Sequence, residues 1–325
     1  MLLSFIIPIY NCEQYIAQCL HHIFNSILLK RDYEVILVDD GSKDGSAAVC
    51  QHYVGQYDNI VYVHQPNQGP ATARNTGLAH ANGDYIWFVD ADDRINPKIL
   101  AKLLEVIKSG VKVDLVSFGY VKQYPGREEP FQLVDTDCTC SGFEFLQMPR
   151  HGSYLWNNVY RREAIGNVRF LDGVSHIEDA CFNYQTIIHF DRVVVFPDIG
   201  YYYNRCNVGS ISNDKHLRDR AKANSDSLLV YQTLYKEMNA SQCTAHSAFL
   251  LKELYFNVTA HIYTMAKFDN VRTLKRFVSQ YEKMGLYPLK QTGNRKGDLF
   301  VHVANRKWLL FLIVRIGKFF KKWSQ

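Results

Sequence analysis

The first 120 residues alternate apolar runs of strand length with segments of helix length, and this alternation constrains the fold most. The apolar runs are Leu3–Ile9, Tyr33–Val38, Ile60–His64, Tyr85–Val89 and Val113–Val121. The helical candidates between them are Glu13–Phe24, Ser46–Tyr57, Pro70–Ala81 and Pro97–Lys108. This order predicts an α/β fold with a doubly wound, mostly parallel sheet flanked by helices.

A polar loop follows each of the first four predicted strands. These loops are Pro8–Asn11, Asp39–Gly45, Asn67–Pro70 and Asp90–Asp93. Ligands in open sheets of this kind bind at the carboxyl ends of the strands, so we expect a single ligand site at this edge. The sequence has neither the glycine-rich dinucleotide fingerprint nor a P-loop, which argues against a nicotinamide dehydrogenase and a P-loop NTPase.

The fourth predicted strand ends in three carboxylates, Asp90, Asp92 and Asp93. Carboxylates this close repel one another unless a cation or hydrogen-bond donors are present. Mg²⁺ and Mn²⁺ prefer such hard oxygen ligands, and Mg²⁺ is usually held by one or two carboxylates together with phosphate oxygens. The alternative is an Asp-rich turn that caps the helix beginning near Pro97.

Two other loops offer groups that can bind a nucleotide. Asp39 and Asp40 end a buried strand, where a carboxylate can accept the imide N–H of uracil, and Tyr10 can provide a flat wall for the base. The alternative for the carboxylates is a tight turn that caps a helix. Arg74 and the free amides after Gly69 can face a diphosphate, or Arg74 can simply lie on a solvated helix face.

Taken in order, these motifs resemble those of family 2 inverting glycosyltransferases of the bacterial cell-surface polysaccharide type, which have the GT-A fold. The resemblance rests on Val38–Gly45, Asn67–Gly69, Ala73–Asn75, Gly83–Ile86 and Asp90–Asp93. It is dense over about the first hundred residues and thinner up to Ser212. It implies a UDP-sugar donor and Mn²⁺ or Mg²⁺ at Asp92 with Asp90. The donor-site and neighbouring residues that it implies are Pro8, Tyr10, Asn11, Asp39, Asp40, Gly69, Arg74, Asp90, Ala91, Asp92, Trp156 and Glu178.

The second half of the chain supplies segments that resemble the acceptor side of the same family. Tyr154–Arg162 resembles a family segment that often reads Trp-x-Lys-Leu-Tyr, with Asn158 where Lys is common. The Glu178-Asp179 pair resembles the family motif whose Asp is the general base, which implies that role for Asp179. The alternative is an acidic helix N-terminus that favours the helix dipole. Tyr201–Arg205 and Gly209–Ser212 resemble the family's Tyr-rich strand and closing loop.

The implied reaction is an in-line displacement at the anomeric carbon, with Asp179 taking a proton from the acceptor hydroxyl. Asp92 would hold the cation, Asp90 the ribose or a metal-bound water, and Asp93 is a second metal candidate. A glycan or a lipid-linked molecule is the expected acceptor. Two alternatives remain, a nucleotidyltransferase and a non-catalytic module that binds sugar nucleotides.

We expect three segments: a glycosyltransferase domain over 1–215 (donor half 1–120, acceptor half 121–215), a helical appendage over 216–298, and a tail over 299–325.

Within the tail, the apolar run Trp308–Val314 is too short to span a bilayer. On a helix, the tail separates an apolar from a basic face, and it has no acidic residue from Arg306 onward. The apolar face holds Trp308, Leu312, Ile316, Phe319 and Trp323, and the basic face Lys307, Arg315, Lys318 and Lys322. This pattern predicts a helix lying on an anionic membrane surface, the alternative being a helix packed on the protein core.

Charge and cysteine content bear on partners and location. The net charge of +5 is modest, and the basic excess lies at the C-terminus, so we expect no nucleic-acid partner. Eight scattered cysteines without paired zinc-type spacing predict free thiols in a reducing compartment. The first apolar run contains Pro8 and has no basic region before it, so we interpret it as a strand and not as a secretion signal. We therefore expect a cytoplasmic protein, peripheral on the cytoplasmic face of the membrane.

Overall fold

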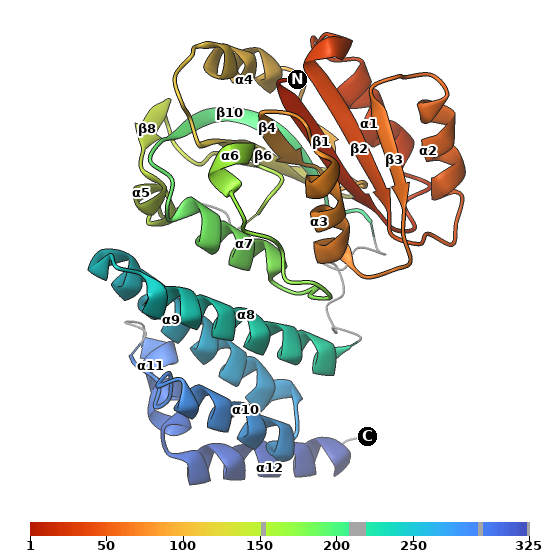
Figure 1. Cartoon of the computed structure of the whole chain (residues 1–325). Coiled ribbons are helices and arrows are strands. Elements are labelled where there is room, and N and C mark those ends of the chain that lie inside the picture. The colour runs from red at the N-terminus through yellow and green to blue at the C-terminus, as the bar shows by residue number, and fades with distance from the viewer. Residues whose placement is uncertain (151–153, 208–218, 292–294, 324–325) are drawn as a thin grey trace. The chain divides into compact units, whose positions relative to one another are not determined.

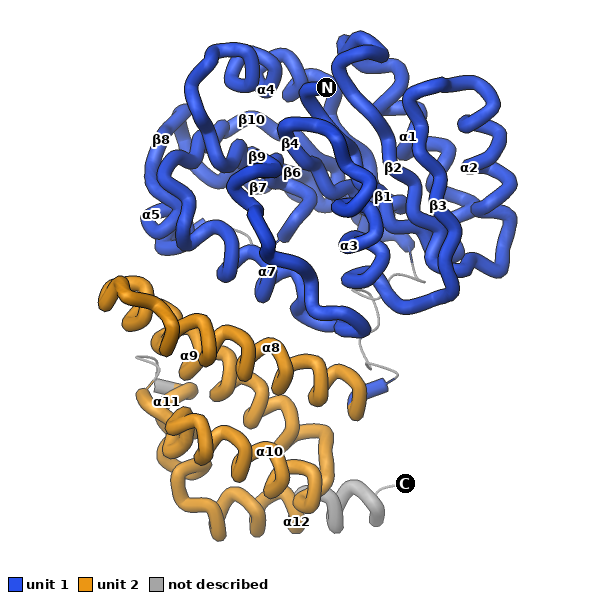
Figure 2. Tube along the Cα trace, viewed as in Figure 1, with its two compact units in different colours: residues 1–220 blue, residues 221–325 orange. Residues whose placement is uncertain are grey.

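The computed structural model describes residues 1–150, 154–207, 219–291 and 295–323 of the 325-residue chain. The chain divides into two compact units, Met1–Arg220 and Ala221–Gln325 (Figure 2). The first unit contains a sheet and helices, and the second contains only helices (Figure 1). The domain boundary expected after residue 215 and the expected closing loop Gly209–Ser212 lie outside the described residues.

The strands of the first unit are β1 Leu3–Ile9, β2 Tyr33–Asp39, β3 Ile60–His64, β4 Tyr85–Phe88, β5 Arg94–Ile95, β6 Leu115–Tyr124, β7 Arg127–Phe131, β8 Cys138–Cys140, β9 Asn158–Arg161 and β10 Val193–Asn204. Its helices are α1 Ile16–Phe24, the 3₁₀ turn η1 Lys30–Asp32, α2 Ser46–Val54, α3 Pro70–His80, α4 Ile99–Lys108, α5 Gly142–Leu146, α6 Arg162–Ile165 and α7 Glu178–Ile187. Helix α8 (Arg220–Ala240) leads into the second unit, which continues with α9 Thr244–Phe268, α10 Val271–Lys283, α11 Arg295–Ala304 and α12 Lys307–Trp323.

The sheet follows the order β3-β2-β1-β4-β9-β6-β10-β5, with β7 beside β6 and β8 beside β10. Strands β3, β2, β1 and β4 pair in parallel, which confirms the predicted α/β fold with a parallel sheet in this half. The other half is mixed, because β9 enters between β4 and β6 and is antiparallel to both. A four-residue strand of this kind has no helix-crossover signature, so strand alternation alone did not predict it.

Side chains of the parallel strands alternate between two buried faces, as the two-residue period of a strand requires. Phe5 and Trp87 belong to a core cluster that also contains residues of α1 and α4. On the opposite face, Gly77 of α3 lies against Ile6 of β1, so closely that a Cβ atom on Gly77 would come within 2.3 Å of Ile6 Cγ2. Helices therefore cover both faces of the sheet (Figure 1).

Parallel pairing brings the carboxyl ends of the first strands together. Ile9 at the end of β1 is in register with Asp39 at the end of β2, and Asp39 is in register with His64 at the end of β3. The backbone continues this pairing past the strands, since Asp40 N–H donates to Ile9 O at 2.8 Å and Val89 N–H donates to Ile6 O at 3.0 Å. The loops that follow these strands consequently share one edge.

The second unit buries one face of each of its long helices. In α10 these buried residues are Leu274, Phe277, Val278 and Tyr281. The terminal helix α12 buries Leu310 and Val314, whereas Trp308, Leu312 and Ile316 of the same helix stay exposed. The tail therefore packs on its own unit through one face and leaves an apolar row free on another. None of the helices in the described ranges combines the length and hydropathy that crossing a bilayer requires.

We predict that Gly77→Ala lowers the free energy of unfolding by about 1–3 kcal/mol, because the added methyl group overlaps a buried isoleucine that has no room to move. Gly55→Ala is the matched control, since its Cβ would meet only ordinary contacts at 3.5 Å and its φ of −68° suits alanine. Urea denaturation of both variants measures the difference. Equal stability of the two variants would contradict the close approach of α3 to β1.

Candidate active site

The three carboxylates after β4 occupy different environments. Asp93 is buried, and its Oδ1 accepts a hydrogen bond of 2.7 Å from the backbone N–H of Asn204. Asp92 is partly exposed, and its Oδ2 accepts a hydrogen bond of 2.7 Å from the side-chain amide of Asn207. Asp90 is held through its backbone, whose N–H donates to the hydroxyl oxygen of Tyr201 at 3.1 Å. The end of β10 and the residues after it thus fix the carboxylate loop.

Burial and mutual repulsion act on these carboxylates. Desolvation, reinforced by the charge of Asp90, raises the pKa of Asp92 to about 6. The pKa of Asp93 is raised well above its ordinary value, mainly by desolvation and then by Asp92 and Asp90. Asp93 is also the most buried of the three, and its Oδ1 is engaged by Asn204, so it is less accessible to a metal ion than Asp92 or Asp90.

The carboxylates at this edge are possible ligands of a divalent cation. Within the described ranges, no three or more His, Cys, Asp or Glu side chains gather closely enough to form a complete metal cage. Mg²⁺ does not require one, since one or two carboxylates plus diphosphate oxygens usually hold it. Asp92 and Asp90, with their partly exposed side chains, fit that role once a nucleotide supplies the remaining oxygens.

Arg74 of α3 connects the carboxylate loop with α7. Its Nη2 donates to Asp90 Oδ1 at 3.0 Å, and its Nη1 donates to Glu178 Oε1 at 2.8 Å. The arginine side chain is 9% exposed and that of Glu178 is 11% exposed. Burial alone would lower the pKa of Arg74, but Asp90 and Glu178 outweigh it and raise that pKa. Residues 74, 90 and 178, far apart in the sequence, meet in this ion-pair network.

Asp179 follows Glu178 at the start of α7. Its Oδ1 accepts the backbone N–H of Ala180 at 2.7 Å. Burial, and next the negative charge of Glu178, raise the pKa of Asp179 to about 7, although Arg74 opposes them. A carboxylate with a pKa near 7 is suited to general-base catalysis at neutral pH.

Backbone strain is found at two positions next to these groups. Among the described residues, Asn11 and Ile177 have positive φ values, 52° and 56°, without being glycine. For a β-branched residue such as isoleucine this conformation is an outlier, and such strain concentrates at functional sites. Ile177 directly precedes the Glu178-Asp179 pair, so the strain sets the direction in which α7 begins.

Asp39 and Asp40 are both buried and bound to protein donors. Asp39 accepts Ser42 N–H at 2.9 Å, Tyr62 O–H at 2.9 Å, and a contact of 3.2 Å with His64. Burial would raise the pKa of Asp39, but these hydrogen bonds outweigh it and lower that pKa.

Asp40 is 3% exposed. It accepts Gln65 Nε2 at 2.8 Å, Gln68 N–H at 2.9 Å and Gly69 N–H at 2.8 Å. Both carboxylates therefore hold the loops at this edge, and the predicted contact with uracil would have to be made by a nearly inaccessible group.

The remaining donor-side residues line the same edge. Tyr10 is 44% exposed, and Pro8 is half-buried within β1. Asn11 ties two loops together, since its Oδ1 accepts Lys43 N–H at 2.8 Å. Gly69 begins α3 with a φ of 88°, a conformation that favours glycine. Ala91 is buried between the carboxylates.

Trp156 is part of an aromatic stack and not an exposed platform. It is 5% exposed and stacks with Tyr154 and with Tyr201, at ring-centroid distances of 4.5 and 4.6 Å. Tyr201 carries the hydroxyl that accepts Asp90 N–H. The tryptophan therefore supports the carboxylate loop through Tyr201.

Three supporting residues were not predicted from the sequence as members of the site: Tyr201, Asn204 and Asn207. The Tyr-rich run that contains the first two was predicted only as a closing strand. Their role depends on β10 pairing with β5 directly after the carboxylates, and that antiparallel pairing of Tyr201 with Ile95 leaves no trace in the sequence.

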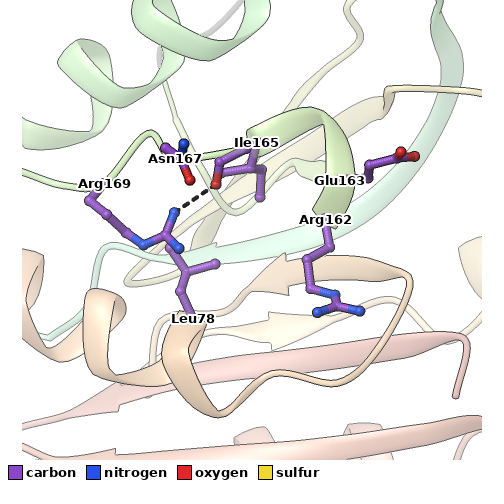
Figure 3. Close-up of a pocket in the computed structure, with 7 residues that line it drawn as sticks. Leu78, Arg162, Glu163, Ile165, Asn167 and Arg169 are labelled. Atoms are coloured by element: carbon purple, nitrogen blue, oxygen red, sulfur yellow. Dashed lines mark hydrogen bonds between the residues drawn. The ribbon is translucent and has the colours of Figure 1, made fainter.

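A cavity of about 380 Å³ lies apart from these residues (Figure 3). Its lining residues come from α3 and from the region of α6: Leu78, Arg162, Glu163, Ile165, Gly166, Asn167 and Arg169. Arg169 folds back to donate to Gly166 O at 2.9 Å, and Arg162 donates to Gly83 O at 2.8 Å. Leu78 is near the C-terminal end of α3, whereas Gly69 begins that helix, so this cavity is separate from the carboxylate edge.

Comparison with known proteins decides the family. Residues 4–169 match the model of glycosyl transferase family 2. The chain belongs to glycosyl transferase family 2. This confirms the expectation of a family 2 enzyme drawn from the motifs. The matched range includes the predicted site residues from Pro8 to Trp156, whereas Glu178 and Asp179 lie beyond its end.

Relatives and solved structures agree with this assignment. The glycosyltransferase is 32% identical over 239 residues to the uncharacterized glycosyltransferase EpsJ of Bacillus subtilis, a match covering 68% of each protein. It is 30% identical over 210 residues to a poly(ribitol-phosphate) beta-glucosyltransferase of Bacillus spizizenii, covering 62% of this chain and 32% of that protein. Its fold resembles residues 1–349 of S. aureus TarS, crystallised with UDP, with a TM-score of 0.73 and 19% identity over 98% of this chain and 92% of that one. The expected GT-A-like fold is thereby confirmed.

We predict that Arg74→Met lowers the free energy of unfolding at pH 7 by about 2–4 kcal/mol, because it leaves the largely buried Glu178 and the partly exposed Asp90 without a counter-charge. Arg150→Met is the control, since Arg150 and its partner Asp135 are exposed and such a pair contributes less than about 1 kcal/mol. Urea denaturation of both variants at pH 7 tests this, and a deficit no larger than that of the control would contradict the ion-pair role.

Proposed function

We propose that this glycosyltransferase moves a sugar from a UDP-sugar donor to a hydroxyl group of a glycan or lipid-linked acceptor, with inversion at the anomeric carbon. The observation that carries the proposal is the pair of ion pairs made by Arg74 with Asp90 and Glu178. Through them, the carboxylates that suit the cation of a nucleotide diphosphate are joined to α7, whose first turn contains Asp179. A donor held by the first group would therefore lie near the base.

Asp179 is the proposed general base. Ionised, it would accept the proton of the acceptor hydroxyl while that oxygen attacks the anomeric carbon, and UDP would leave on the opposite side. Glu178 and Arg74 would hold the helix start in place and would not exchange the proton themselves. Asp179 is the member of the pair left without an arginine hydrogen bond, which supports giving it the catalytic role.

Asp92 and Asp90 are the residues that would hold Mn²⁺ or Mg²⁺. Such an ion, when bound, stabilises the negative charge that develops on the leaving diphosphate. Support comes from the hard oxygen donors at this edge and from a solved mannosyltransferase of Pyrobaculum calidifontis, which contains GDP-mannose and Mn²⁺ and shares this fold with a TM-score of 0.53. Arg74 uses two of its nitrogens on carboxylates, so we assign it a positioning role in place of the predicted diphosphate contact.

The proposed classes of sugar donor and acceptor are supported by similar proteins. TarS, the structural neighbour, has been crystallised with UDP-GlcNAc, which supports a UDP-sugar donor for this chain. Tyr10, Asn11 and the loops held by Asp39 and Asp40 would form the uridine side. Relatives named for poly(ribitol-phosphate) glucosylation and for minor teichoic acid biosynthesis support an acceptor in cell-surface polymer synthesis.

We predict that Asp179→Asn lowers the transfer rate about 10²- to 10⁴-fold, because an amide cannot take the acceptor proton. Donor binding should be unchanged, since the substituted atom does not contact the donor edge. UDP release from UDP-sugars in the presence of acceptor measures transfer, and calorimetry with UDP measures binding. Loss of both properties would count against the base assignment, and UDP release equal to that of the unaltered enzyme would exclude it.

The dependence of the rate on pH gives a second readout of the same prediction. Because the pKa of Asp179 is raised to about 7, the base is protonated and inactive below that pH. The transfer rate should therefore rise with pH through about 7 and then level off. The residual transfer rate of Asp179→Asn should not show this rise with pH.

We also propose that α12 places the enzyme on the cytoplasmic face of an anionic membrane. The exposed row Trp308, Leu312 and Ile316 lies beside the exposed cations Arg306 and Arg315, a combination that suits the interface of an anionic bilayer.

We predict that the protein co-sediments with vesicles that contain phosphatidylglycerol. A much smaller fraction of the protein should co-sediment with neutral vesicles. Replacing the three exposed apolar residues Trp308, Leu312 and Ile316 by serine should reduce binding at least tenfold, since their apolar area is what enters the lipid. Phe256→Ser with Tyr263→Ser, which removes two exposed aromatic rings from α9, is the control. Equal losses in both variants would contradict a specific role for α12.

A further inference from the structure

The two units carry opposite charge. Residues 221–325 contain 17 Lys and Arg against 6 Asp and Glu, whereas residues 1–220 contain 20 against 26. The helical unit is therefore strongly cationic, and α12 accounts for only part of the excess. A field of this sign attracts anionic partners to the unit as a whole.

A cavity of about 440 Å³ lies within this cationic unit, between the start of α8 and the first turns of α10. Its lining residues are Ala221, Asn224, Arg272, Thr273, Arg276 and Phe277. No acidic side chain is among them. The cavity is thus lined by two guanidinium groups, an amide, a hydroxyl and an apolar wall, a set that is rich in hydrogen-bond donors.

Asn224 contributes a donor without a partner to this cavity. The residue is 5% exposed, and its Nδ2 is buried without a hydrogen-bond partner. Its Oδ1 lies 2.9 Å from His261 Nε2, and His261 Nδ1 lies 2.6 Å from the hydroxyl of Tyr281.

This chain of contacts fixes which amide atom is left over. Asn224 Oδ1 can only accept a hydrogen bond, so its contact with His261 Nε2 is made by an Nε2–H donor. With the ring proton on Nε2, His261 Nδ1 accepts a hydrogen bond from the hydroxyl of Tyr281, whose pKa is raised by burial. The two N–H groups of the asparagine remain unused, and a buried polar group without a partner costs about 1–3 kcal/mol. A ligand acceptor in the cavity would remove that cost.

Arg272 and Arg276 are one turn apart on α10, so both project from the same side of the helix. Both are exposed, and neither forms an ion pair within the described part of the chain. The guanidinium of Arg276 lies 4.9 Å from the ring of Phe277, which limits its orientation. Near a helix N-terminus, where the dipole is positive, two such groups favour an anion that can accept several hydrogen bonds at once.

We propose that this cavity binds a phosphate ester of the acceptor, with Arg272 and Arg276 on the phosphate oxygens and the Asn224 amide on the innermost oxygen. A phosphate offers several acceptor oxygens and thus matches two guanidinium groups and an amide better than a carboxylate does. The innermost donor is recessed, so a single ester group that enters the cavity fits it better than a flat membrane surface. The binding itself is independent of catalysis, whereas its role in holding the acceptor rests on the proposed function.

Calorimetry tests the binding with the full-length protein and glycerophosphoglycerol, a soluble phosphodiester, and with glycerol as the uncharged comparison. We expect binding of the diester alone and at least a tenfold loss of affinity in Arg272→Gln with Arg276→Gln. The matched control is Lys252→Gln with Lys283→Gln, which removes the same charge from exposed positions outside the cavity. Comparable weakening in the control, or no diester binding by the unaltered protein, would overturn the proposal.

Two further experiments distinguish binding in the cavity from the remaining explanations. Asn224→Leu keeps the approximate size of the side chain but removes the amide, so diester affinity should fall while circular dichroism stays native; unchanged affinity would exclude the recessed donor. If phosphatidylglycerol vesicles bind through the two arginines but the soluble diester does not, the surface is a membrane site and the proposal is wrong.

The role in holding the acceptor has its own readout. With a phosphate-bearing acceptor, the double arginine variant should raise the acceptor KM at least tenfold and leave kcat and the UDP-sugar KM unchanged. An unchanged acceptor KM would overturn that role. Absence of any UDP-sugar turnover in the unaltered enzyme would instead refute the proposed function, while the calorimetric result would stand by itself.

Discussion

The ion pairs of Arg74 are the interaction on which the rest of the site depends. One guanidinium, almost fully buried, binds Asp90 from the end of β4 and Glu178 from the start of α7. Neither carboxylate could be buried so far without this counter-charge, because desolvating an unpaired carboxylate costs several kcal/mol. Arg74 itself is placed by α3, whose close packing on β1 is possible because position 77 is glycine. The packing of α3 on the sheet therefore determines where the ion pairs of the site form.

Hydrogen bonds from β10 hold the carboxylate loop from the other side. Strand β10 runs past the loop, where Tyr201 accepts the N–H of Asp90 and Asn204 donates to Asp93. The stack of Trp156 on Tyr201 links this support to the residues before β9. Only Asp92 and Asp90 of the three carboxylates keep partly exposed side chains. The fold thus separates the carboxylates into one buried group bound to the backbone and two groups that are partly exposed.

The helical unit differs from the first in both charge and chemistry. It carries the cationic excess of the chain, and its terminal helix divides its apolar residues between a buried row and an exposed row. Near the start of α10, the buried chain from Tyr281 through His261 to Asn224 ends in an unused amide beside two arginines. An exposed apolar row and an arginine-lined cavity within one unit agree with the proposed membrane contact and the proposed phosphate-bearing acceptor.

Strand alternation and loop composition determined the α/β fold and the common edge where the strands end, because these properties are local or follow from parallel pairing. The functional roles of Asp90, Asp92 and Asp179 came from the resemblance to the family and stay predictions. The insertion of β9 between β4 and β6 was decided only by the tertiary structure, since nothing in four residues encodes their neighbours. The same holds for the roles of Asp40 and Arg74. The sequence predicts ligand contacts for both residues. In the folded chain, protein N–H groups donate to Asp40, and Arg74 donates to two carboxylates, so protein partners use much of their hydrogen-bonding capacity. Which polar group meets a ligand and which meets the protein depends on contacts between residues up to about a hundred positions apart, and such contacts exist only once the chain has folded.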